Sequence, residues 1–254
     1  FDPSLLQTMV DKAEKDQADL VQCAFIRTDR KTKKVISTDM AHNPTTPIGN
    51  PMDYTNIVFL HTGVPAKLFR RSIIGNDVRF GDSHRFEDLA FVAKFLAKAK
   101  AVSFINEPLY HYIISSESVS TFGSEAAVEQ ELSDARRILL ELKDFYSKTN
   151  PKAYEDGFVD SLAFLRYGIG LTTRACLSKY VKSHKVIKES EQFLNQNFPR
   201  WKTSRYLMRK NTKRFGKKAE FVQWCKHLYR IHCFGLFVVN YSVYTKIFKT
   251  DIKP

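Results

Sequence analysis

Two neighbouring carboxylates are the residues of this 254-residue sequence best suited to chemistry. Glu87 and Asp88 stand directly before an apolar run with helical spacing. The dipole of a helix stabilises an ionised carboxylate at its N-terminus, as a general base requires. Successive helical residues point about 100° apart, so one acid of the pair faces any given site. Acids that only stabilise a helix N-terminus give the same pattern, and this alternative stays open.

The elements that must position this pair alternate between helix and strand over the first 114 residues, which predicts an α/β arrangement. A long surface loop is expected over 37–56, where Pro, Asn, Thr and Asp are frequent. The predicted helices begin near Ser4 and cover 66–74 and 86–100. The predicted strands cover 20–26, 35–36, 57–61, 102–105 and 109–114, with a turn at Asn106-Glu-Pro108.

From Glu125 onwards the apolar residues recur with helical spacing, which predicts an all-α domain. The expected helices cover 125–148, 155–181, 183–197, 203–231 and 233–249. We therefore expect two domains, an α/β domain over 1–122 and a basic helical domain over 123–254.

Three motifs follow one another in the first domain: Lys67-Leu-Phe-Arg70, Glu87-Asp-Leu-Ala-Phe91 and Ile105-Asn-Glu-Pro-Leu-Tyr110-His-Tyr112. In this order they resemble the second half of the catalytic domain of family 2 glycosyltransferases. The resemblance covers about residues 1–122. It implies a partial GT-A fold, the Rossmann-like fold of nucleotide-diphospho-sugar transferases, without its N-terminal half. The basic helical region loosely resembles the tails of bacterial members that build surface polysaccharides or teichoic-acid-like polymers, which implies an enzyme of that type.

The resemblance assigns roles to residues of this sequence. Asp88 becomes the general base of an inverting transfer to an acceptor hydroxyl, while Glu87 supports the fold or touches the acceptor. Ile113 stands where family members often have an arginine that contacts the donor diphosphate. His111 is one candidate for the missing charge, although a simple edge-strand side chain is the alternative. The residues expected to bind donor or acceptor are Lys67, Arg85, His111, Ser118 and Ser120.

The family's first half carries a nucleotide-binding unit and an Asp-x-Asp motif, neither of which occurs here. The resemblance implies that about 90 to 100 residues of such a domain are absent. Mn²⁺ or Mg²⁺ is accordingly expected in the full-length enzyme and not in this chain, which should be inactive alone. The implied partners are a nucleotide-sugar donor and a glycan, lipid-linked or polyanionic acceptor.

The net charge of +13 is concentrated in one region. Residues 179–230 contain 15 Lys and Arg against three Asp and Glu, whereas the preceding residues are nearly neutral. A solvated helical surface is one explanation. Docking on anionic lipid, an anionic polymer or, as the runner-up, nucleic acid is the other. The expected basic surface comprises Arg209, Lys210, Lys213, Arg214, Lys217 and Lys218.

The sequence also restricts the compartment. The longest apolar run, 233–239, is far shorter than the roughly 20 residues of a membrane span, so we expect a cytoplasmic protein, peripheral on the inner face of the membrane. The four cysteines show no secreted disulfide pattern. Cys225 and Cys233, with two histidines between them, favour a packed helix over a zinc site because the short ligand spacing is absent. A homo-oligomer formed through the helical domain stays open.

Overall fold

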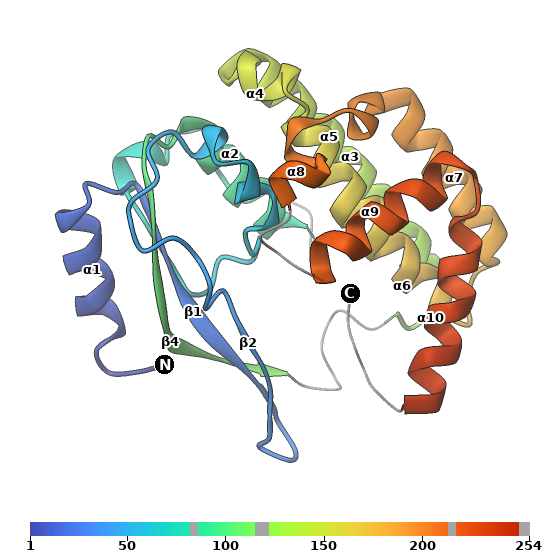
Figure 1. Cartoon of the computed structure of the whole chain (residues 1–254), viewed down its shortest axis with the longest axis horizontal. Coiled ribbons are helices and arrows are strands. Elements are labelled where there is room, and N and C mark those ends of the chain that lie inside the picture. Colours follow the sequence, from blue (N-terminus) through green and yellow to red (C-terminus); the bar gives the residue numbers. More distant parts are fainter. Residues whose placement is uncertain (82–85, 115–121, 213–216, 249–254) are drawn as a thin grey trace. The chain divides into compact units, whose positions relative to one another are not determined.

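A computed structural model describes residues 1–81, 86–114, 122–212 and 217–248, with backbone alone for 217–218 and 242–248. The chain divides into two compact units. Residues 1–121 form the α/β unit, coloured from blue to green in Figure 1, and residues 122–254 form the helical unit, coloured from green to red.

Strand β1 (Leu20–Asp29) is the centre of the sheet in the α/β unit. Its first six residues are buried and, apart from Gln22, apolar, as expected for a strand covered on both faces. β1 pairs in parallel with β4 (Val102–Ile114) along its whole length. Its other edge pairs antiparallel, first with β3 (Lys67–Phe69) and then with β2 (Val35–Asp39).

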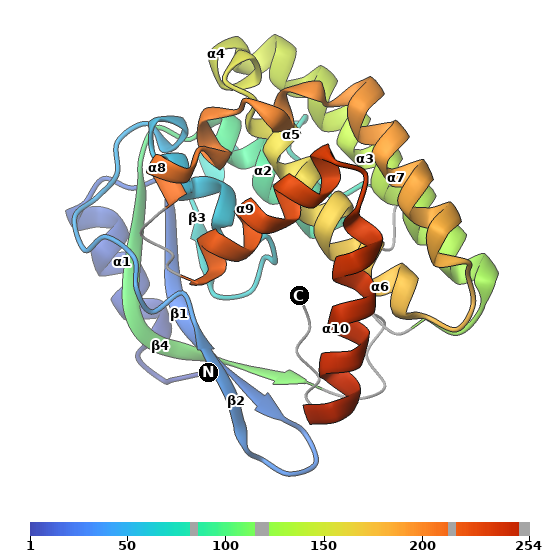
Figure 2. The same cartoon turned by 45° about the vertical axis from the view of Figure 1, so that its right-hand side comes forward.

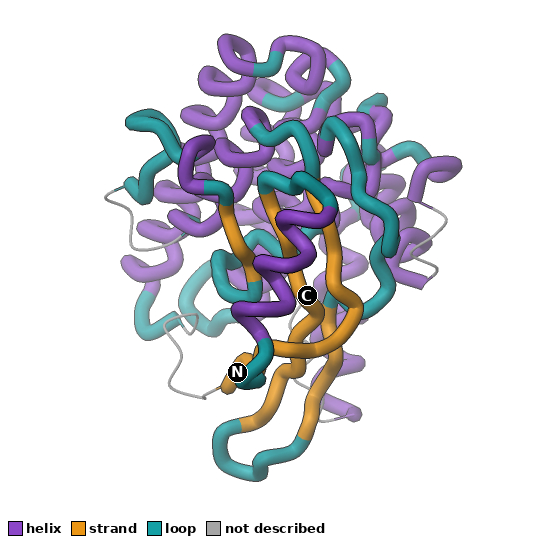
Figure 3. Tube along the Cα trace, turned by 90° about the vertical axis from the view of Figure 1, so that its left-hand side faces the viewer, coloured by secondary structure: helices purple, strands orange, loops and turns teal. Residues whose placement is uncertain are grey.

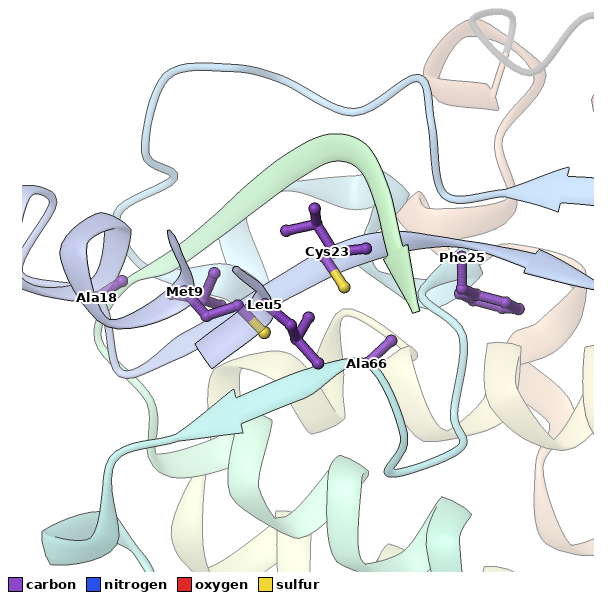
Figure 4. Packing of buried hydrophobic residues seen from close by; sticks show 8 residues of the cluster. Leu5, Met9, Ala18, Cys23, Phe25 and Ala66 are labelled. Carbon is purple, nitrogen blue, oxygen red and sulfur yellow. The ribbon is translucent and has the colours of Figure 1, made fainter. Parts of the chain in front are cut away.

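Two helices cover the sheet. α1 (Leu5–Lys15) places Leu5 and Met9 against Cys23 of β1 (Figure 4), and Figure 3 shows the helix crossing in front of the strands. Leu68 of β3 packs against this cluster. The neighbouring Phe69 packs against the rings of Phe91 and Phe95 in α2 (Glu87–Lys98). Successive side chains of a strand point to opposite faces of the sheet. α1 and α2 therefore lie on opposite faces.

Two expectations for residues 57–74 were wrong. The segment predicted as a helix over 66–74 forms β3 and the 3₁₀ helix η3 (Arg71–Ile73). The strand predicted over 57–61 is a 3₁₀ helix, η2 (Thr55–Phe59). The surface loop expected over 37–56 is confirmed in part: residues 40–50 form a loop without buried residues, whereas 37–39 belong to β2 and Pro51 and Met52 are buried in η1 (Pro51–Asp53). The helices predicted near Ser4 and over 86–100 are confirmed as α1 and α2.

β4 is one strand where two strands and a turn were expected. Ile105 pairs with Cys23 and Pro108 pairs with Ala24, so Asn106 and Glu107 bulge out of the ladder. A bulge tolerates proline, which has no N–H to donate to a partner strand. The Asn106 side chain accepts from the backbone N–H of Asn43 (2.9 Å) and donates to its carbonyl (3.0 Å), which fastens the bulge to the preceding loop.

The helical unit is built around long helices α3 and α7. Ion pairs and hydrogen bonds join Arg136 of α3 to Glu189 of α7, and Lys143 to the carbonyl of Asn197, so the two helices run side by side in the same direction (Figure 2). The elements are α3 (Glu125–Thr149), α4 (Pro151–Glu155), α5 (Phe158–Leu162), the π-helix η4 (Ala163–Leu171), α6 (Thr172–Leu177), α7 (Ser183–Asn197), η5 (Pro199–Lys202), η6 (Arg205–Leu207), α8 (Arg209–Thr212), α9 (Lys217–Arg230) and α10 (Phe234–Phe248).

The helices predicted over 125–148, 183–197 and 233–249 are confirmed as α3, α7 and α10. The helix predicted over 203–231 is wrong, because the described part of that segment divides into η6, α8 and α9. The helix predicted over 155–181 runs from Phe158 to Leu177 and contains the π-helix.

The core of the helical unit is aromatic and contains satisfied hydroxyl groups. Trp201 stacks on Phe164 with ring centres 4.7 Å apart. The hydroxyl of Tyr229 donates to the carbonyl of Gly168 in the π-helix (2.5 Å) and lies 3.3 Å from the hydroxyl of Ser190. Thr172 donates to the carbonyl of Tyr167 or to Ser190, at 2.9 and 2.8 Å. These side chains satisfy polar groups where the helical pattern changes.

Candidate functional site

The start of α2 holds the acidic pair in its first turn. Phe86, directly before Glu87, has a φ of 64°, in the left-handed region that bulky residues rarely adopt. Ala66, directly before Lys67, has the same φ. Strained backbone of this kind is frequent at functional sites. Two of the three sequence motifs thus begin beside a strained residue.

Asp88 lies against the turn formed by residues 61–64. Its Oδ2 accepts a hydrogen bond from the backbone N–H of Val64 at 3.3 Å. A Cβ atom on Gly63 would lie 3.6 Å from this oxygen and 2.6 Å from Cε1 of His61. The Asp88 carboxylate and the His61 imidazole therefore flank Gly63, which has no room for a side chain unless His61 moves.

His61 is a site residue that the sequence analysis missed. It follows an apolar run that predicts a strand, and nothing in that pattern distinguishes it from a core histidine. The ring of Phe25 in β1 packs edge-to-face against the imidazole with centres 4.8 Å apart. An imidazole can donate or accept a hydrogen bond at neutral pH. The structure brings such a group beside the carboxylate that the sequence singled out.

Glu87 is half-buried, and its Oε2 is buried without a hydrogen-bond partner among the described residues. An unsatisfied buried acceptor is unfavourable by about 1–3 kcal/mol. Such an oxygen keeps its capacity to accept a hydrogen bond. Because Asp88 has a backbone partner and this oxygen has none, the two acids differ in their surroundings.

Lys67 and Arg70 of the first motif make intramolecular contacts. The Lys67 ammonium donates to the carbonyl of Gly63, so it holds the turn beside Asp88. Arg70 Nε donates to Asp19 Oδ1 at 2.8 Å, while the backbone N–H of Lys100 donates to Asp19 Oδ2 at 2.7 Å. Arg70 therefore fastens the end of β3 to the start of β1.

His111 lies elsewhere on the sheet. It is exposed on β4 opposite Ile26, and its charge contributes to a lowered pKa of Asp2, after the larger contribution of hydrogen bonds from Ser4. Within the described residues no hydrogen bond or ion pair joins His111 to Asp88. The structure therefore brings Asp88, its neighbour Glu87 and Lys67 together, and among the described residues no hydrogen bond or ion pair connects His111 to them. Arg85, Ser118 and Ser120 lie outside the described residues.

Comparison with known proteins gives a structural match. No family model matches the sequence, and no curated protein matches it. Thirteen solved chains match, among them the crystal structure of S. aureus TarS 1–349, a teichoic-acid glycosyltransferase. That match has a TM-score of 0.56 and 13% sequence identity, and covers 90% of this chain. The chain has a glycosyltransferase-like fold. It spans 63% of the TarS chain.

The described residues contain no group of three or more His, Cys, Asp and Glu placed to hold a metal ion. Burial raises the pKa of the Cys225 thiol in α9 to about 12. Burial also raises the pKa of the Cys23 thiol under α1.

The expected basic surface is described in part. Arg209 and Lys210 lie on α8 and are exposed. Lys217 and Lys218 begin α9 with backbone alone, and Lys213 and Arg214 fall outside the described residues. None of the helices in the described part of the chain combines the length and the apolar character needed to cross a membrane.

Proposed function

We propose that this chain is the acceptor-side part of a glycosyltransferase that moves a sugar from a nucleotide-diphospho-sugar to a hydroxyl of a glycan or cell-envelope polymer. The main support for this proposal is the Asp88 carboxylate at the N-terminus of α2, which accepts a hydrogen bond from Val64 and lies beside His61. The glycosyltransferase-like fold of the chain also supports it. GT-A family 2 membership and inversion of the anomeric centre belong to this proposal.

In the proposed reaction the acceptor oxygen bonds to the anomeric carbon as the bond from that carbon to the donor diphosphate breaks. The acceptor proton goes to Asp88, and the nucleoside diphosphate leaves with the bonding electrons. The hydrogen bond from Val64 fixes the direction of the carboxylate. Glu87, through its free buried oxygen, accepts a hydrogen bond from the acceptor and so orients the attacking hydroxyl.

Lys67 supports this site by holding the Gly63 turn. Donor contacts from Arg85, Ser118, Ser120 and His111 remain part of the proposal, as does a location on the cytoplasmic face of the membrane. The resemblance implies Mn²⁺ or Mg²⁺ in the full-length enzyme. The described residues do not by themselves form such a metal site, so we assign no step to a metal.

The concentration of charge in residues 179–230 supports a second candidate function. In this alternative the chain is a non-catalytic binding module, and its helical unit holds nucleic acid or another anionic polymer. It requires no chemistry at Asp88, so substitution of that residue distinguishes the two candidates.

The decisive experiment is sugar transfer by the full-length protein, followed as release of nucleoside diphosphate. Asp88→Asn should lower the rate roughly 10²–10⁴-fold, the range for loss of a positioned general base. Because the change is isosteric, folding measured by circular dichroism should be unchanged. Glu107→Gln, at an exposed carboxylate in the β4 bulge, is the matched control and should retain the wild-type rate.

The companion variant is Glu87→Gln. If Glu87→Gln abolishes transfer while Asp88→Asn leaves it near normal, the two roles are reversed. If neither change lowers the rate, the proposed site is wrong. Calorimetric titration of the 254-residue chain with UDP-sugars and Mn²⁺ should show weak binding or none, and micromolar metal-dependent affinity would contradict the assignment to the acceptor side alone.

A further inference from the structure

Lys226 of α9 is buried without a charged partner. Only 6% of the surface of Lys226 is exposed, and its neighbours Cys225 and Tyr229 on the same helix are also buried. Within the described residues its ammonium forms no hydrogen bond, ion pair or contact with an aromatic ring. Lysine is almost never buried in this way without a partner, because desolvation of the charge is costly. The burial lowers the pKa of Lys226 to about 8, with the charge of Arg230 adding to the effect.

Two more cations lie at the same corner. Arg230 follows Lys226 by one helical turn, and its guanidinium donates to the carbonyl of Lys202 in η5 at 2.5 Å. The Lys202 ammonium lies 5.5 Å from the centre of the Trp201 ring. In the described part of the chain, no Asp or Glu forms an ion pair with any of these three cations. The positive charges of Lys226, Arg230 and Lys202 are therefore not neutralised by acidic side chains in the described part of the helical unit.

Trp201 adds an unused donor. It is 1% exposed, and its indole Nε1 has no hydrogen-bond partner among the described residues. Its ring centre lies 6.1 Å from that of Tyr229, the neighbour of Arg230. Buried indole N–H groups usually find a partner. Two independent observations, a largely buried lysine and a buried indole N–H that both have no partner among the described residues, thus occur on α9 and η5, which the hydrogen bond of Arg230 joins.

We infer that Lys226, Arg230 and Lys202 form a binding site for a phosphate group. A phosphate ester neutralises these charges and offers several acceptor oxygens to donors that come from two elements. The site is separate from the acidic pair, so it goes beyond the proposed transfer reaction and does not depend on it. The phosphate belongs either to a soluble anionic polymer or to a lipid headgroup, which have the same chemistry at this site.

The first test uses the full chain and inorganic pyrophosphate. Without anion, Lys226→Met should raise the thermal midpoint, because it removes a partly desolvated charge that has no partner among the described residues. Pyrophosphate should raise the midpoint of the wild type but not that of Lys226→Met. By calorimetry its affinity should fall about tenfold or more in the variant, as expected for the loss of a charged hydrogen bond.

Two further variants keep this test decisive. Arg230→Gln changes an exposed residue, should fold normally and should also weaken pyrophosphate binding. Lys188→Met removes an exposed lysine of α7 and should bind pyrophosphate as the wild type does. Equal affinity in Lys226→Met and wild type, or a wild type that pyrophosphate does not stabilise, overturns the inference.

The source of the phosphate is tested with two probes. Wild type and Lys226→Met are compared for binding to soluble inorganic polyphosphate and for co-sedimentation with phosphatidylglycerol vesicles, with phosphatidylcholine vesicles as the control. Loss of binding in the variant with one probe supports the site and identifies that source. Binding that is independent of Lys226 with both probes contradicts a site for phosphate groups.

Discussion

Two polar regions, the acidic pair of the α/β unit and the hydroxyl network around Tyr229 in the helical unit, differ in how their hydrogen-bonding groups are satisfied. In the α/β unit, Glu87 keeps a buried oxygen without a partner beside the partly exposed Asp88. In the helical unit, the hydroxyls of Tyr229, Ser190 and Thr172 are buried and satisfy one another or the backbone. A satisfied network stabilises one packing arrangement, whereas an unsatisfied group is available to a ligand. Polar substitutions should therefore affect stability mainly in the network and binding mainly at the acidic pair.

The largest change in stability is expected for Tyr229→Phe. The variant removes the hydroxyl that donates to Gly168 and lies beside Ser190, leaving buried polar groups less satisfied. The free energy of unfolding of the helical unit should fall by about 1–3 kcal/mol, measured by denaturant titration with hydrogen exchange to locate the effect. Tyr180→Phe is the control, because that hydroxyl makes no hydrogen bond within the described residues. Equal losses for both variants would show that the network contributes nothing.

A smaller change is expected for Asn106→Ala in the α/β unit. This change removes both side-chain hydrogen bonds to the backbone of Asn43. Because the residue is only half-buried, water replaces part of what is lost, and we expect about 1 kcal/mol. Hydrogen exchange should increase in β4 and in the loop that contains Asn43. Glu107→Ala, at the exposed neighbour in the bulge, should leave exchange unchanged, and the same increase there would argue against the Asn106 contacts.

The smallest change in stability is expected for Glu87→Gln, within about 0.5 kcal/mol of the wild type. The Oε2 atom has no partner to lose within the described residues, so the fold gains little from this carboxylate. The free energies of unfolding of the variant and the wild type are measured by chemical denaturation at the same pH. A loss of several kcal/mol would show that Glu87 is a structural residue and would remove the contrast between the acidic pair and the hydroxyl network.

The sequence predicts the elements that depend on local pattern. The apolar stripe of Leu89, Val92, Phe95 and Leu96 gives α2, and with it the position of Glu87 and Asp88 at a helix N-terminus. The apolar run from Leu20 likewise gives β1. These features arise within a single element, so neighbouring residues contain the information.

Elements that depend on distant partners could not be predicted in this way. The segment from Pro65 has good helix formers, yet Lys67, Leu68 and Phe69 pair with β1 and become a strand. Tertiary pairing outweighs helix propensity, which differs by less than about 1 kcal/mol between most residues. His61 joins the site through Phe25 and Gly63, contacts that its own sequence neighbourhood does not predict.

The bulge in β4 also restricts how this segment can change during evolution. From Ile105 opposite Cys23 to Tyr110 opposite Phe25, β4 advances five residues while β1 advances two. β4 thus contains an odd number of extra residues relative to β1. Because side chains alternate between the two faces, an odd number of extra residues reverses this alternation beyond the bulge. Deletion or insertion of one residue between 106 and 109 would reverse it again and exchange the faces of Tyr110 and His111. Relatives of this protein should therefore vary in the composition of this segment more readily than in its length.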